Sequence, residues 1–260
     1  LSTNSLLAGI CTPYKWQGKI IVKSGGILRV SNSAALNLLA GSQLEVQDGG
    51  TAIIESTGAL DFQGGIITLT GSNALLNIAG ILNIGASKNF TFTGTGFVKF
   101  SSTVTNANNI VAGTGSQMTL NGKNMFSHKV LEVAQDQLWL PTNLTSLNIS
   151  SGKVVFSHNS GKIKQQTSPG TPTAINFQNV KLTNDLTIRT NYIGLYLLNG
   201  NNITIDNCIF TNGLIGIYGY FATTGTTLNV AGANFINCNT GISLNGGSFV
   251  IGSSIFDNCN

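Results

Sequence analysis

Charged residues are scarce in this sequence. Aspartate, glutamate, lysine and arginine together make up 8% of its 260 residues, against about 25% in an ordinary soluble domain. Helices on protein surfaces usually expose Lys, Glu and Arg, so this composition argues against most helical folds. The surface must consist of Ser, Thr, Asn, Gln and Gly, which suit short strands separated by turns.

Other features are also missing. Proline occurs only 4 times, which excludes a collagen-like chain or a proline-rich linker. No apolar run is long enough to span a membrane. The net charge is +4 and the isoelectric point about 8.9, yet no run of Lys or Arg is present, so we expect no nucleic-acid partner. No signal peptide is visible and the first residue is Leu1, so we expect a processed piece of a longer polypeptide that continues beyond Asn260.

Short glycine-containing units repeat in the N-terminal half. The apolar residues Leu28, Leu44 and Leu60 are equally spaced, and each lies in a unit of the same kind, namely GGILRV, GSQLEV and GALDF. A fixed period of this kind indicates a repeat architecture. The equal spacing predicts that successive units belong to successive, very short coils.

A longer unit repeats in the C-terminal half. Its copies begin at Ile175, Ile203, Leu228 and Phe249, and the steps between them shorten toward the C-terminus. Aligning the copies produces an asparagine column and a phenylalanine column, which we expect to stack at one corner and inside the fold, respectively: Asn184, Asn212, Asn237 and Asn258; Phe210, Phe235 and Phe256.

The apolar residues alternate within each unit, which is the period of a β-strand. Stacking successive units would bury a continuous core. We therefore predict an all-β fold, a parallel β-solenoid that is right-handed, with coils of about 16–28 residues. An antiparallel sandwich would not need matched columns, and a propeller blade needs about 40 residues.

The predicted organisation has two parts. Residues 1–18 would form an N-terminal cap. Residues 19–260 would form the solenoid, with short coils over 19–120, an irregular middle over 121–174 and longer coils over 175–260.

Two segments resemble known proteins. Residues 16–30 (WQGKIIVKSGGILRV), followed by LNLLAGSQLEV, resemble the repeat region of secreted Bacteroidetes surface proteins, which commonly carry a type IX secretion signal. The segment NITIDNCIFTNGLIGIYG resembles the right-handed β-helix repeats of the pectin-lyase-like superfamily. The resemblance implies a β-helix in an extracellular or cell-surface location. It implies no single activity, because that superfamily holds lyases, hydrolases, tailspikes, adhesins and inert shafts.

Catalytic chemistry finds little support in the sequence. A glycoside hydrolase needs two carboxyl groups across the scissile bond, and most acidic residues here are isolated. Glu45 and Asp61 lie in equivalent outward positions of successive short units, and Arg29 occupies the same position one unit earlier. We interpret this column as a solvated charge ladder rather than a site. The superfamily's hydrolase pattern (NTD, DD, GHG, RIK) and its lyase pattern RxPxxR are absent, so we expect no enzyme activity.

Metal and cofactor sites are not expected. His128 and His158 lie in the middle region without an accompanying cluster of Cys or carboxylates. Two of the four cysteines, Cys238 and Cys259, share a column and each lies in an Asn-Cys-Asn triplet. We favour a ladder of buried thiols, and a disulfide between these two residues stays open.

Aromatic residues near the C-terminal coils are the candidate ligand-binding residues: Tyr192, Tyr196, Tyr218, Tyr220 and Phe221. Exposed rings can stack on sugars, whereas the structural alternative is that they cover the apolar bases of nearby loops. The sequence thus favours a non-catalytic structural or adhesive module of a secreted cell-surface protein. The alternatives are a carbohydrate-binding module and a fragment of a polysaccharide lyase or hydrolase that lacks its active site. The expected partners are flanking domains of a longer polypeptide, and glycans or other surface proteins.

Overall fold

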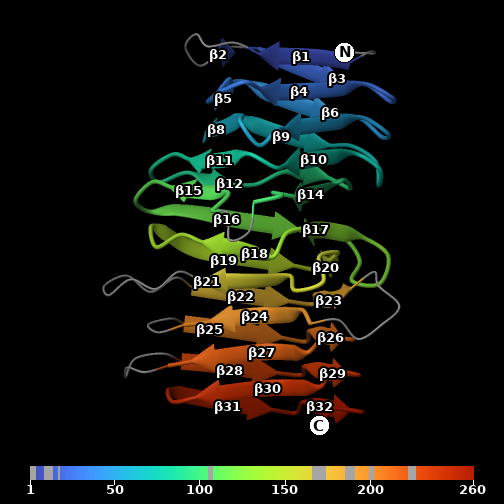
Figure 1. The fold of residues 1–260 in the computed structure, drawn as a ribbon, viewed down its shortest axis with the longest axis vertical. Coiled ribbons are helices and arrows are strands. Elements are labelled where there is room, and N and C mark those ends of the chain that lie inside the picture. The colour runs from blue at the N-terminus through green and yellow to red at the C-terminus, as the bar shows by residue number, and fades with distance from the viewer. Residues whose placement is uncertain are drawn as a thin grey trace.

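The computed structural model describes residues 4–8, 14–16, 18–104, 108–165, 174–184, 191–198, 202–221 and 227–260. These residues contain only strands, turns and irregular segments, and the named strands all pair in parallel. The strands stack along one axis from the N-terminal to the C-terminal end (Figure 1). The predicted all-β parallel solenoid is confirmed. In this part of the chain no helix is present that could cross a membrane.

One sheet, sheet A, runs the whole length of the solenoid. Its eleven strands follow each other in chain order: β1 (Asn4–Ala8), β4 (Ile27–Ser31), β7 (Thr51–Ile54), β10 (Leu75–Ile78), β14 (Phe97–Phe100), β17 (Lys129–Val133), β20 (Lys153–Phe156), β23 (Lys181–Asn184), β26 (Ile209–Thr211), β29 (Asn234–Ile236) and β32 (Ile255–Asp257).

The second face consists of two sheets of five strands each. Sheet B contains β2 (Tyr14–Trp16), β5 (Ala35–Leu39), β8 (Ala59–Gln63), β11 (Ile81–Ile84) and β15 (Ile110–Ala112). Sheet E contains β18 (Gln137–Leu140), β21 (Lys162–Gln165), β24 (Ile193–Leu197), β27 (Ile215–Tyr220) and β30 (Thr240–Asn245).

The third face is also divided. Sheet C contains β3 (Lys19–Val22), β6 (Gln43–Val46), β9 (Ile66–Leu69) and β13 (Thr93–Gly94). Sheet D contains β12 (Asn89–Phe90), β16 (Ser116–Asn121), β19 (Leu144–Ser150), β22 (Ala174–Gln178), β25 (Asn202–Asp206), β28 (Thr227–Ala231) and β31 (Ser248–Gly252). Only sheet A therefore connects the two ends without a break.

The coil repeat in the N-terminal half is longer than the spacing of its leucines predicted. Lys19 pairs with Gln43, so one coil covers more sequence than the step from Leu28 to Leu44. Leu28, Leu44 and Leu60 lie in β4, β6 and β8, on three different faces. The leucine spacing therefore links every second strand of a three-stranded coil. The prediction of very short coils was wrong because all three faces carry the same local pattern.

The longer repeat in the C-terminal half is the true coil repeat. Ile175 pairs with Ile203, which pairs with Leu228, which pairs with Phe249. The region over 121–174 contributes β17 to β21 to the same sheets. The longest step along sheet A leads into this region, where Val98 pairs with Leu131. The weak pattern in the middle sequence therefore reflects longer turns between regular strands.

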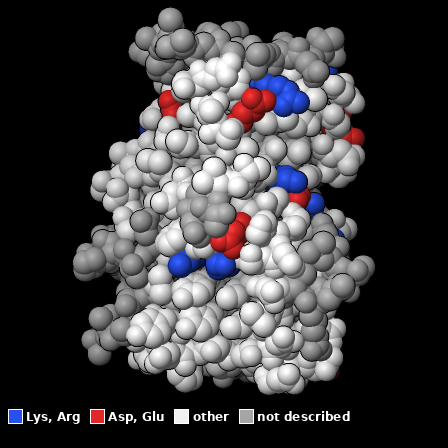
Figure 2. Space-filling view, in the orientation of Figure 1, with Lys and Arg blue, Asp and Glu red and all other residues white. Residues whose placement is uncertain are grey.

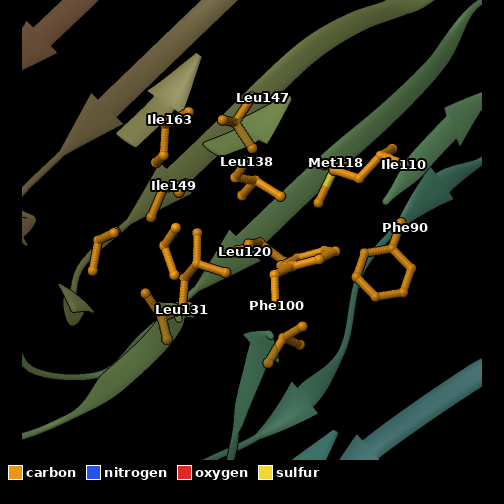
Figure 3. Packing of buried hydrophobic residues seen from close by; sticks show 14 of the residues in the cluster. Phe90, Phe100, Ile110, Met118, Leu120, Leu131, Leu138, Leu147, Ile149 and Ile163 are labelled. Atoms are coloured by element: carbon orange, nitrogen blue, oxygen red, sulfur yellow. The ribbon is translucent and has the colours of Figure 1, made fainter. Parts of the chain in front are cut away.

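The core fills the interior of the coils. Buried and outward side chains alternate along most of the strands from β3 to β29. Leu131, Leu138 and Leu147 bring sheets A, E and D together in one coil (Figure 3). Each such side chain contributes about 1.5–3 kcal/mol of apolar burial. One contiguous cluster of buried apolar residues runs from Val22 to Cys238.

The first and last coils of the solenoid end the stack of strands. Strands β1 and β2 are the terminal strands of sheets A and B, so residues 1–18 contribute a first set of paired strands, and the other parts of the predicted cap lie outside the described residues. At the opposite end the apolar side chains of β31 and β32 are exposed, among them Phe249 and Phe256.

Candidate binding site

A polar pocket lies where the chain leaves sheet A for the second face. Its volume is about 550 Å³. Three successive coils contribute its lining through the segments that follow β14, β17 and β20. The lining residues are Ser101, Ser102, Thr103, Val104, Ala134, Asp136, His158 and Ser160.

Asp136 is the carboxylate of this pocket. Lys162 Nζ lies 3.2 Å from Asp136 Oδ1, and Gln137 Nε2 donates a hydrogen bond to Asp136 Oδ2 at 2.9 Å. Burial raises the pKa of the carboxyl group, but the hydrogen bonds from Gln137 and Lys162 outweigh it, so the net pKa is lowered. The pocket therefore presents an ionised carboxylate, and the Lys162 ammonium group, which is not a lining residue, is its ion-pair partner.

His158 and Ser160, in the segment that follows β20, also line the pocket. The Ser160 backbone N–H donates to His158 Nδ1 at 3.3 Å, and Ser160 Oγ lies 3.4 Å from the same nitrogen. A catalytic triad requires the carboxylate to orient the imidazole, whereas Asp136 is paired with Lys162. The set of side chains suits hydrogen bonding to a polyhydroxylated ligand better than activation of a serine nucleophile.

A buried amide network underlies the pocket. Asn109 and Gln135 are each only 2% exposed. Gln135 Nε2 donates to Asn109 Oδ1 at 2.6 Å, and Gln135 Oε1 accepts from the Ser102 backbone N–H at 3.0 Å. Asn109 Nδ2 donates to the Gly80 carbonyl at 2.8 Å. These amides connect the coils at the break between sheets B and E, where the strands of the second face do not pair with each other.

The sequence did not predict this pocket. Asp136 and His158 are far apart along the chain, and no metal or cofactor site was expected at the histidine. The number of residues in one coil is the available clue. Gln137, the neighbour of Asp136, pairs with Lys162 of the next coil. A search for polar residues one coil apart would have brought the pocket residues together.

Two of the five predicted ligand-binding residues are in the core. Tyr192 is fully buried, its ring stacks on Phe156 at 4.7 Å, and its hydroxyl donates to the Thr211 carbonyl. Burial raises the pKa of Tyr192 well above its ordinary value. Phe221 is 3% exposed. Neither ring can meet a ligand at the surface, which corrects the expectation for both residues.

The other predicted rings lie on the outer face of sheet E. Tyr196 pairs with Tyr218, and their ring centroids are 4.8 Å apart. The column continues in the other direction through Lys164 to Trp139, and Lys164 Nζ lies 4.4 Å from the Trp139 ring and 4.9 Å from the Tyr196 ring. Neighbours therefore cover both faces of the Tyr196 ring, which leaves its edge and hydroxyl for a ligand. Tyr220 is exposed.

The asparagine column lies at the corner that follows sheet A. Asn184 Nδ2 donates to the Asn212 carbonyl at 2.8 Å, and Asn258 Nδ2 donates to Asn237 Oδ1 at 2.7 Å. The φ angles of Asn212, Asn237 and Asn258 are 60°, 54° and 51°, in the left-handed region that asparagine tolerates. Turn geometry and amide pairing thus both favour asparagine here.

The phenylalanine column points inward beside it. Phe210 stacks on Phe235 at 4.8 Å, and Phe235 stacks on Phe256 at 4.9 Å. Phe210 and Phe235 are fully buried, whereas Phe256 in the last coil is exposed.

The predicted charge column does not exist. Arg29 lies on sheet A, Glu45 on sheet C and Asp61 on sheet B. Arg29 pairs with Glu55 at 2.9 Å, and Glu45 pairs with Lys19. The column was inferred from the equal spacing of the short units. It does not form because successive units lie on different faces of the solenoid.

The described cysteines are free thiols: Cys208, Cys238 and Cys259. Burial raises the pKa of Cys208 to about 12 and also raises the pKa of Cys238. Such groups are poor nucleophiles and poor metal ligands. Cys11 lies outside the described residues.

No metal centre is evident in the described part of the chain, which contains no group of three or more His, Cys, Asp or Glu side chains placed to hold an ion. His128 is buried, and this burial, together with the nearby charge of Lys123, lowers its pKa.

Comparisons with known proteins give the following. No protein-family model matches the chain, and no curated protein matches it. Among solved structures, the surface protein and adhesin PfbA of Streptococcus pneumoniae aligns with 92% of this chain and 91% of its own, at 8% sequence identity and a TM-score of 0.23.

Proposed function

We propose that this chain is a non-catalytic structural or adhesive module of a secreted cell-surface protein. The observation that carries the proposal is the architecture itself, in which one sheet and one core run through successive coils. Such a stack is stiff along its axis because each coil is bonded to its neighbours. Figure 2 shows charged residues in small, separate groups on an otherwise uncharged face, which suits a spacer.

The geometry of the acidic residues supports the absence of catalysis. Hydrolysis of a glycoside requires two carboxyl groups roughly 5–10 Å apart. Asp136 is the single carboxylate among the residues that line the pocket, and it is paired with Lys162. Glu45 and Asp61 lie on different faces. Incubation with pectin, alginate and neutral glycans should yield no new reducing ends and no unsaturated products. Turnover that Asp136→Asn abolishes would refute the proposal.

A carbohydrate-binding module is the second candidate, and the polar pocket formed by the segments after β14, β17 and β20 favours it. Hydroxyl, imidazole and carboxylate groups line it, and these groups can exchange hydrogen bonds with sugar hydroxyls. A glycan array is the test. If the native chain binds a glycan, Asp136→Asn and His158→Ala should abolish that binding. Asp48 is an exposed carboxylate at another turn of the solenoid, so the control Asp48→Asn should retain the binding.

The lineage and location belong to the same proposal. The resemblance to Bacteroidetes surface repeats and to pectin-lyase-like β-helices supports an extracellular or cell-surface location, export by type IX secretion, and flanking domains in a longer polypeptide. Protease treatment of intact cells of the source organism tests the location, because a surface protein would be digested while cytoplasmic proteins stay intact.

A further inference from the structure

Three lysines form an outward column on sheet A. Lys129 pairs with Lys153, and Lys153 pairs with Lys181. Neighbouring strands are about 4.8 Å apart, and like charges placed directly opposite each other destabilise a sheet. All three side chains are half-buried, and the next side chain along each strand is buried, so the lysines face outward. A column that breaks this rule calls for a functional explanation.

A β-bulge brings the first lysine into the column. The register between β17 and β20 shifts between Lys129 and Leu131, because Lys129 pairs with Lys153 while Leu131 pairs with Val154. Without the extra residue, Val130 would oppose Lys153. Bulges commonly re-aim a side chain, and this one sets Lys129 opposite Lys153, with its ammonium group against Glu132 and the Phe97 ring.

The column is only partly neutralised. Glu132 lies 3.1 Å from Lys129 Nζ and 3.0 Å from Lys99 Nζ. Among the described residues, no carboxylate forms an ion pair with Lys153 or Lys181. The surrounding sequence is also basic, since eight of the thirteen basic residues but two of the nine acidic residues lie between positions 62 and 184. Within the described part of the chain, Lys153 and Lys181 therefore form a positive strip along the solenoid axis.

We propose that Lys129, Lys153 and Lys181 bind a linear sulfated glycan that lies along this axis. The regular spacing of the lysines fits a polymer with repeating negative charges. Lysine is a point charge with three donors, whereas arginine is the usual bidentate partner of planar carboxylates. A column of lysines without arginine therefore favours a tetrahedral oxyanion such as a sulfate ester.

The same surface is less suited to nucleic acid. Single strands bind through aromatic rings on which bases stack, and the Tyr196 ring on the adjoining face is already covered by Lys164 and Tyr218. A glycan needs no stacking platform here, because the half-buried Thr183 hydroxyl in the next outward column can bond to a sugar hydroxyl.

Binding of dextran sulfate to the purified chain tests the proposal, with unsulfated dextran as the matched ligand. The chain should bind dextran sulfate and not dextran. The double variant Lys153→Gln/Lys181→Gln should bind about tenfold more weakly, and its dependence of log affinity on log salt should be shallower by about two, one per lysine. The control Lys23→Gln/Lys88→Gln removes the same charge elsewhere and should lose less than about threefold by the same reasoning.

Further variants separate charge from folding. Lys153→Arg/Lys181→Arg keeps the charge and should keep the binding. Lys153→Gln should raise the thermal midpoint at low salt, because it removes a like-charge contact. Asp136→Asn should not weaken dextran sulfate binding. A failure of the proposed glycan binding in the polar pocket can therefore be distinguished from a failure of the proposed lysine site.

Several results would overturn the proposal. They are equal binding of dextran and dextran sulfate, equal losses in the two glutamine double variants, and loss of binding in a folded arginine variant. Equal or tighter binding of polygalacturonate or single-stranded DNA through the same lysines would also overturn it, because the ligand class would then be wrong.

Discussion

The ring of Phe235 lies against the α-carbon of Gly216. A Cβ atom at Gly216 would be 2.7 Å from Phe235 Cδ1 and 2.7 Å from the Gly241 carbonyl oxygen. Gly194 and Gly241 occupy equivalent positions against Phe210 and Phe256. The repeated glycine of the C-terminal coils is therefore the counterpart of the phenylalanine stack, since only glycine lets sheet E approach the rings.

We predict that Gly216→Ala destabilises the protein. Both atoms nearest the added methyl group are held by the core or by the backbone, so overpacking should lower the free energy of unfolding by about 1–3 kcal/mol. Urea denaturation followed by circular dichroism measures the change. Gly252→Ala is the control, because its added Cβ would meet nothing within 4 Å. Equal stability of the two variants would refute the packing argument.

We predict that Gln135→Ala weakens the junction between sheets B and E. The substitution removes the partner of Asn109 Oδ1 and of the Ser102 backbone N–H, and leaving buried groups unpaired should lower the free energy of unfolding by about 2–4 kcal/mol. Gln117→Ala is the control, because Gln117 is exposed on β16. This variant should change the free energy of unfolding by less than about 0.5 kcal/mol. Hydrogen exchange should show the largest loss of protection at residues 79–84 and 108–112. Uniform loss along the chain would contradict this local role.

We predict a pH-dependent contribution from Glu132. Burial raises the pKa of this carboxyl group, but hydrogen bonds from Ser157, Lys99 and Lys129 outweigh burial and lower it below 4.5. A lowered pKa stabilises the fold above the unfolded-state pKa, and the contribution is lost as the pH falls through the folded-state value. Glu132→Gln should therefore lower the free energy of unfolding by about 1–3 kcal/mol at neutral pH, and the difference should shrink in acid. An unchanged difference at about pH 3 would mean that the charge is not the cause.

We predict that the Cys208 thiol makes the protein sensitive to alkali. Its pKa is raised from 9.0 to about 12 by burial. The stabilisation is complete below the unfolded-state value and is lost as the pH rises toward the folded-state value. The free energy of unfolding should fall by a few kcal/mol more in the native chain than in Cys208→Ala between about pH 9 and pH 12. Parallel pH profiles of the two proteins would contradict the assignment.

The sequence allowed the fold to be predicted because the alternation of apolar residues depends only on local geometry. The copies at Ile203, Leu228 and Phe249 also aligned correctly, because their strands and turns repeat as one whole coil. The short coils predicted for the N-terminal half failed because Leu28, Leu44 and Leu60 lie in identical local patterns on three faces. Local similarity cannot tell one face from the next.

The sites were harder to predict, because their residues meet across coils of unequal length. The step from Lys129 to Lys153 is shorter than the step from Lys153 to Lys181, and a bulge intervenes in the first. Tyr192 and Phe221 are candidate ligand-binding residues in the sequence because they lie in segments whose length varies from coil to coil. Their burial depends on the packing of the coil and not on the local pattern.

A non-catalytic surface module that binds a sulfated glycan should leave that glycan intact. The most direct measurement is the molar-mass distribution of a bound glycan, determined by light scattering before and after prolonged incubation with an equimolar amount of the chain. The account predicts a complex from which the glycan is recovered at unchanged molar mass. Recovery of shorter glycan molecules after incubation with the native protein, but not after incubation with the Asp136→Asn variant, would contradict it.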